Sequence, residues 1–178
     1  MSVQSSFTLT ETRSEASVAR TIYRSFPPTG VYNEGLFTVL GTDLSQKIAD
    51  QWQWLLGADA QPLVQTAFGD IIFRSERHSA VFFIEVQRRK SSKIDEEMSF
   101  DCNVFLQNAG IREKLLREGL AKELSSRLGS LEYGRCYIAE PWESVGGSGA
   151  ASTFERGDVV VYNSLAAQSS HRILDTRR

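Results

Sequence analysis

The sequence predicts an α+β fold in which helices pack on a mixed or mainly antiparallel sheet. Helical and strand-like segments are interleaved without a strict strand–helix–strand repeat. The clearest pair of strands, residues 67–74 and 80–87, is separated only by a short charged turn, which is typical of a hairpin. The 178 residues are 41% hydrophobic and 24% charged, a balance that predicts a folded globular protein.

The first part of the chain predicts a frayed start followed by short elements. Residues 1–12 are polar and are expected to be irregular. A helix is predicted over 14–26, since apolar side chains recur there every four residues, and Pro27 would end it. A turn rich in glycine then leads to a short predicted strand over 36–40.

The most regular helical pattern follows this strand. Asp43 and Gln46 have the spacing of a capping box, and Gly57 is suited to end the helix. One face of this helix carries an apolar stripe and is expected to be buried: Leu44, Ile48, Trp52 and Leu55.

The second strand of the predicted hairpin has apolar side chains on both faces. Val81 and Phe83 alternate with Phe82 and Ile84 along it. A strand with this pattern is expected to lie in the middle of a sheet, with its two faces covered.

Two further helices are predicted after the hairpin. The first runs over 92–105 with Ser92 as its cap, and the second runs over 111–128 with leucines at every fourth position from Leu116. Asn108 and its neighbours separate the two.

The remainder of the chain returns to a strand and then closes with one more element. The strand is predicted over 133–139. Asp158 is suited to cap a helix through Gln168, although three consecutive valines at 159–161 make a strand nearly as favourable. Residues beyond Ser169 are expected to form a mobile tail.

Composition argues against several classes of function. The formal charge of −2 disfavours nucleic-acid binding, which needs a basic surface. No apolar run approaches the roughly 20 residues that span a bilayer, and the start has no signal-peptide pattern, so a cytoplasmic location is expected. Cys102 and Cys136 are expected to be buried thiols, and neither His78 nor His171 has a neighbour at metal-ligand spacing.

The strongest enzymatic alternative is a magnesium-dependent nuclease. Asp70 on one strand of the hairpin and Glu85 on the next could place two carboxylates together, the ligand type that Mg²⁺ prefers. Gln87 occupies the position where such nucleases carry a lysine. Asp70 directly follows Gly69, so it can also begin the strand or form a hydrogen bond within a turn. The residues therefore favour a structural role for both carboxylates.

Other motifs have both a structural and a functional interpretation. The loop Gly146–Gly149 could bind a phosphate through its amides, but it lacks the ending of a P-loop, so a connector is favoured. Acidic residues after the basic run 88–93 would complement a helix start, or would mimic DNA phosphates toward a nuclease: Asp95, Glu96, Glu97 and Asp101. Trp142 could pack in the core or anchor a partner.

Several motifs, taken in order along the chain, resemble one known family. Thr66-Ala-Phe-Gly-Asp-Ile-Ile-Phe73 and Val81-Phe-Phe-Ile-Glu-Val86 are followed by Gly134-Arg-Cys-Tyr137, Gly146-Gly-Ser148 and Leu165-Ala-Ala-Gln168. This order resembles the immunity proteins of type VI secretion DNase toxins. The upstream Gly30-Val-Tyr-Asn-Glu-Gly-Leu-Phe37 and the helix through Trp52 resemble the end of the GAD-like domain that often precedes that domain.

The resemblance implies a protein that binds rather than catalyses. It implies a cognate toxin as partner, no cofactor, and no direct contact with nucleic acid or membrane, while self-association stays open. It divides the chain into a shortened GAD-like region, residues 1–60, and an immunity domain, residues 61–178, packed as one unit. The candidate contact residues are Asp95, Glu96, Glu97, Asp101, Trp142 and Glu143. A general protein-interaction module is the remaining alternative.

Overall fold

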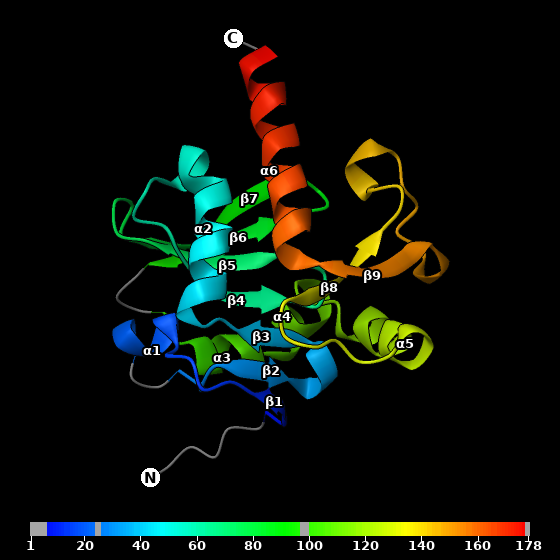
Figure 1. Cartoon of the computed structure of the whole chain (residues 1–178), viewed down its shortest axis with the longest axis horizontal. Helices are drawn as coiled ribbons and strands as arrows, with labels where there is room; N and C mark the ends of the chain where they lie inside the picture. The colour runs from blue at the N-terminus through cyan, green and yellow to red at the C-terminus, as the bar shows by residue number, and fades with distance from the viewer. Residues whose placement is uncertain (1–6, 24–25, 97–99, 177–178) are drawn as a thin grey trace.

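The central feature of the computed structural model, which describes residues 7–23, 26–96 and 100–176, is an antiparallel sheet. In this described part, seven strands lie side by side in the order of the sequence, and each pairs antiparallel with the next (Figure 1). The strands are β1 (Leu9–Thr12), β2 (Gly30–Tyr32), β3 (Phe37–Val39), β4 (Gln61–Thr66), β5 (Ile71–Ser75), β6 (Ala80–Glu85) and β7 (Lys90–Glu96).

Helices and a separate hairpin complete the fold. The hairpin consists of β8 (Arg135–Ala139) and β9 (Phe154–Asp158). The helices are α1 (Val18–Ile22), α2 (Thr42–Leu56), α3 (Cys102–Gln107), α4 (Ala109–Lys114), α5 (Glu118–Leu128) and α6 (Val159–Thr176), with short 3-10 turns η1 (Asn33–Gly35), η2 (Glu143–Val145) and η3 (Ala151–Thr153). This architecture confirms the predicted α+β fold with helices on a mainly antiparallel sheet.

The sheet carries a hydrophobic core on each face. On one face α2 and α6 pack together over Phe73 and Ile84 (Figure 1). On the other face, Phe83 belongs to a core that includes Leu106 of α3 and Leu124 of α5. Neighbouring residues of β6 therefore point into different cores, which confirms the prediction of a strand covered on both sides.

A buried hydrogen-bond junction links α2, α6 and the sheet. Trp52 Nε1 of α2 donates to Asn163 Oδ1 of α6 at 2.9 Å. Asn163 Nδ2 donates in turn to the carbonyl of Gly69 at 3.2 Å, in the turn between β4 and β5. Because buried polar groups are costly unless bonded, this junction fixes how α6 sits against both α2 and the sheet.

Most of the predicted elements are present near their expected limits. The most regular predicted helix is α2, ended by Gly57 with φ of 93°; its predicted capping box is wrong, because the helix begins at Thr42 after Gly41 and Asp43 pairs with Lys47 instead. The hairpin, the strand before Ala139 and the Asp158 cap are also confirmed, since Asp158 Oδ1 accepts the N–H groups of Val160 and Val161. Both cysteines are buried free thiols, as predicted.

The clearest error concerns residues 92–105. The predicted helix is replaced by β7, which pairs with β6 so that Ser92 lies opposite Phe83. The helix begins at Cys102 instead, and its cap is Asp101, whose side chain accepts two backbone N–H groups. Pairing with the exposed edge of β6 outweighs the local helical pattern, and the charged side chains of β7 suit an edge strand.

Other boundaries also differ from the predictions. Part of the expected frayed start forms β1, while α1 is shorter than the predicted helix 14–26. The predicted helix 111–128 is two helices, because Arg117 adopts left-handed backbone angles between them. The expected mobile tail after Ser169 continues α6, whose hydrogen bond from Ser170 Oγ to the Ala166 carbonyl lies beyond the predicted end.

Two observations concern the chain as a whole. Pairing of β3 with β4 carries the sheet across residue 60, so both predicted regions contribute strands to it. Within the described residues, no helix combines the length and the apolar character that crossing a membrane requires.

Candidate functional site

Asp70 forms the buried end of an ion network that reaches the surface at Arg88. It follows the turn between β4 and β5 and is only 3% exposed. The backbone N–H of Val86 donates to Asp70 Oδ1 at 2.7 Å, and Arg117 Nη2 lies 3.6 Å from Asp70 Oδ2. Burial raises the pKa of Asp70 to about 7, although Arg117 and the Val86 N–H act in the opposite direction.

Arg117 is a residue of this network that no sequence motif indicates. It lies just before α5 with φ of 49°, a left-handed conformation that is uncommon for a residue with a side chain. Its guanidinium lies 3.7 Å from the ring centre of Phe68, and Nη1 donates to Glu143 Oε1 at 3.0 Å. One side chain thus ties α5 to a sheet turn and to η2.

The second carboxylate of the suspected nuclease pair is also engaged. Glu85 Oε2 accepts from Arg88 Nη1 at 3.0 Å, and Arg88 Nε donates to Glu143 Oε2 at 2.9 Å. Glu143 therefore joins the two arginines, and the network runs without a break from Asp70 to Glu85. Each of the two carboxylates therefore has an arginine within ion-pair distance.

Gln87 lies in the core rather than beside the ion network's solvent edge. It is 1% exposed, and its side-chain amide interacts with the Tyr162 hydroxyl. Among the residues that the structure describes, no three His, Cys, Asp or Glu side chains gather in a way that could hold a metal. The ion pairs of Asp70 with Arg117 and of Glu85 with Arg88 favour the structural interpretation of both carboxylates.

The candidate contact residues do not form one surface cluster. Asp95 and Glu96 lie on the edge strand β7, where Glu96 pairs with Lys93, whereas Asp101 caps α3. Glu97 lies outside the described residues. Among these candidate residues, Glu96 is exposed at the edge of the sheet, where it could contact a charged partner protein.

Trp142 and Glu143 have partners inside the protein. The Trp142 ring packs edge-on against Tyr162 of α6, with ring centres 5.4 Å apart. Glu143 bonds both Arg88 and Arg117. Through these contacts, the two residues hold η2 against α6 and against the segments that carry Arg88 and Arg117.

The Gly146–Gly149 loop folds back on the segment before it. The N–H groups of Gly146 and Gly147 donate to the carbonyls of Glu143 and Trp142 at 3.2 and 3.0 Å. Since these amides are already bonded, they cannot surround a phosphate. The loop acts as a connector, which agrees with the favoured sequence interpretation.

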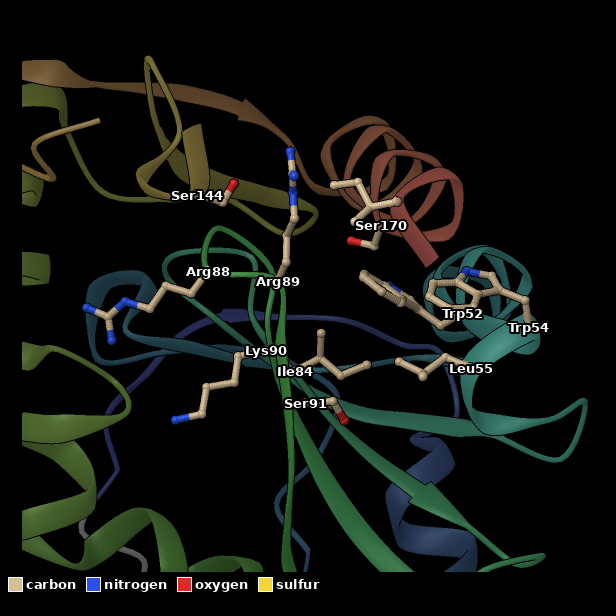
Figure 2. A pocket seen from close by; sticks show the side chains of 11 residues that line it. Trp52, Trp54, Leu55, Ile84, Arg88, Arg89, Lys90, Ser91, Ser144 and Ser170 are labelled. Atoms are coloured by element: carbon tan, nitrogen blue, oxygen red, sulfur yellow. The ribbon is translucent and has the colours of Figure 1, made fainter. Parts of the chain in front are cut away.

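A pocket that no sequence motif indicated lies between α2, α6 and the turn from β6 to β7. Its volume is about 420 Å³. Figure 2 shows Trp52 and Trp54 of α2 on one side and Arg89 on the other, with Ile84 beneath and Ser170 of α6 above. The lining residues are Trp52, Trp54, Leu55, Ile84, Arg88, Arg89, Lys90, Ser91, Ser144, Ser170 and Ile173. Leu55, predicted to be buried, is 36% exposed here, while Leu56 fills the core.

Comparison with known proteins identifies a structural neighbour. No protein-family model matches the chain, and no curated protein is similar to it in sequence. Among solved structures, the crystal structure of Atu4351 from Agrobacterium tumefaciens is similar, with a TM-score of 0.56 and 17% identity. The match covers 79% of this chain and 70% of that chain. At this identity the likeness concerns the fold, and it supports the α+β architecture described above.

Proposed function

We propose that this chain is a cytoplasmic immunity protein that binds and neutralises a type VI secreted antibacterial toxin with DNase activity. The ordered resemblance of residues 30–170 to such immunity proteins motivates the proposal. The structural observation that favours binding over catalysis is the pairing of both candidate carboxylates with arginines.

The ion network suits a rigid binding scaffold better than a catalytic centre. A hydrolytic metal site needs carboxylates that are open toward substrate and water. Asp70 is instead buried beneath Arg117, and Glu85 is held by Arg88. Such a network holds turns from distant parts of the chain together, as a preorganised interface requires.

The proposed mechanism is stoichiometric occlusion of the toxin. A stable complex of this kind typically buries roughly 1,200–2,000 Å² in total and can cover an active site or a DNA entrance without chemistry. Acidic side chains at the β7 edge would approach a basic DNA-binding cleft favourably. Asp95 and Glu96 are the described acids of that edge.

Co-expression tests the proposal directly. The chain is produced together with a catalytically inactive variant of the toxin encoded beside it, and we expect the two proteins to co-elute at equal stoichiometry. With the active toxin, we expect cells to survive with intact chromosomal DNA. Absence of both complex and protection would reject the immunity function.

The nuclease alternative is tested on the purified protein alone. DNA is incubated with the protein and Mg²⁺, and no cleavage is expected. Cleavage that disappears in the Asp70→Asn variant would instead establish the nuclease alternative and reject the proposal.

Reversal of Glu96 to lysine tests the acidic edge. If this edge steers the toxin, Glu96→Lys should lower the association rate by about 3- to 10-fold at low salt, and the difference should shrink as salt is added. Stopped-flow or surface-based kinetics measures the rate. Glu113→Lys, an equally charge-reversed exposed residue of α4, is the matched control. An equal rate for both variants would remove the β7 edge from the interface.

A further inference from the structure

The pocket between α2, α6 and the β6–β7 turn combines an apolar wall with a cation that has no acidic partner among the residues that the structure describes. Trp54 packs beside Trp52, with ring centres 6.1 Å apart, and Leu55, Ile84 and Ile173 extend the apolar surface. Within the described part of the chain, no carboxylate forms an ion pair with Arg89.

The neighbouring basic residues are differently placed. Arg88 is bonded to Glu85 and Glu143, and Lys90 Nζ lies 3.9 Å from Glu85 Oε1. In Figure 2 the side chains of Arg88 and Lys90 extend away from the tryptophans, whereas Arg89 extends along the pocket toward Ser144. Arg89 therefore supplies the positive charge of the pocket.

The polar atoms of the pocket that lack partners are mainly donors. Trp54 Nε1, Arg89 Nε and Ser144 Oγ are buried, and none has a hydrogen-bond partner among the described residues. An indole N–H and a guanidinium N–H can only donate, and a hydroxyl can donate as well. Because buried donors without acceptors are costly, a group rich in acceptors that drew these side chains toward the pocket would satisfy them.

We infer that this pocket is a binding site for a small organic anion, a carboxylate carried on an apolar ring. The carboxylate would accept hydrogen bonds from Arg89 and Ser144, and the ring would lie against Trp52 and Trp54. The volume of about 420 Å³ falls within the range of small-molecule sites. The inference goes beyond toxin neutralisation and does not depend on it.

Nuclear magnetic resonance on the 178-residue chain tests this inference. The indole N–H signals of the three tryptophans are recorded, and the signal that Trp54→Phe removes is assigned to Trp54. Naphthalene-2-acetate is the probe, and naphthalene-2-acetamide is its uncharged counterpart. We expect saturable displacement of the Trp54 signal and about 10-fold tighter binding of the carboxylate than of the amide, as for a hydrogen bond to a charged group.

Variants of Arg89 identify the cation. Arg89→Gln should weaken naphthalene-2-acetate binding by about 10-fold and leave the amide unchanged, whereas Arg89→Lys should retain most of the preference for the carboxylate. Arg77→Gln, in the turn between β5 and β6, is the matched control and should bind like the unaltered protein.

Three results would each overturn the inference. These are equal affinities for acid and amide, an unchanged affinity in Arg89→Gln, or an unmoved Trp54 signal at about 10 mM probe, a concentration above the Kd of even weak ligands. Loss of toxin protection with retained probe binding would reject the proposed function alone, so the two failures are distinguishable.

Discussion

Replacing Arg117 with methionine is expected to lower the free energy of unfolding by about 3–5 kcal/mol at pH 8.5, the usual cost of removing one partner of a buried ion pair. Methionine retains much of the aliphatic packing but leaves Asp70 buried without its cation. It also removes the contact over the Phe68 ring and one of the two arginines that bond Glu143. Chemical denaturation of both proteins at fixed temperature measures the difference.

The cost of this substitution should depend on pH. Burial raises the pKa of Asp70 in the folded protein to about 7, above its ordinary value of 3.8. Between these values the folded state holds a proton that the unfolded state has lost, so the contribution of Asp70 to stability falls as pH rises and is flat above about 7. At pH 5 the carboxyl is neutral, and losing Arg117 should cost less than at pH 8.5.

Asp70→Asn is the control for this assignment. It retains an oxygen for the Val86 N–H but carries no charge at any pH. The stability difference between wild type and Asp70→Asn should change by up to about 1.4 kcal/mol per pH unit between pH 4 and 7. In the Asp70→Asn background, Arg117→Met should cost the same at pH 5 and pH 8.5. A pH-dependent cost in that background would show that another group is responsible.

The parts of the fold that could be predicted are those with strong local signals. The apolar stripe and Gly57 define α2, and the alternation of Val81 to Ile84 predicts a strand covered on both faces. In each case the order of apolar and polar residues along a short segment determines which side chains are buried. Local spacing is then enough to identify the element.

Elements defined by distant partners could not be predicted in this way. The strand β7 is polar and has helical caps in its sequence, and it is extended because β6 offers it an unpaired edge. The end of α6 was missed for a related reason, since its packing on α2 outweighs the polar composition after Ser169. Tertiary contacts override propensity in both places.

The candidate site shows the same division. The hairpin register was visible, so Asp70 and Glu85 could be placed on neighbouring strands. The cation that pairs with Asp70 could not, because Arg117 lies far along the chain, just before α5, whereas the partner of Glu85 is Arg88, only three residues away. The pocket around Arg89 is likewise assembled from four separate segments, and none of them carries a recognisable motif.

Substitution of Gly69 by alanine is expected to lower the free energy of unfolding by about 2–4 kcal/mol, the sum of backbone strain and overpacking. Gly69 has φ of +75°, which disfavours any side chain. A Cβ atom there would lie 2.8 Å from a Tyr162 ring carbon and 3.2 Å from Cys136 Sγ. Relief would require α6 to move away from the sheet turn, and this movement would lengthen the hydrogen bond from Asn163 to the Gly69 carbonyl.

Gly146→Ala separates the two contributions to that loss. Gly146 also has a positive φ, +95°, but nothing lies within 4 Å of its Cβ position. Its substitution should therefore cost only the backbone strain, about 1–2 kcal/mol. Denaturation of both variants measures the difference, which reports how tightly α6 is packed on the β4–β5 turn. Equal losses would mean that Tyr162 and Cys136 can shift freely, and the turn would then not hold α6 in place.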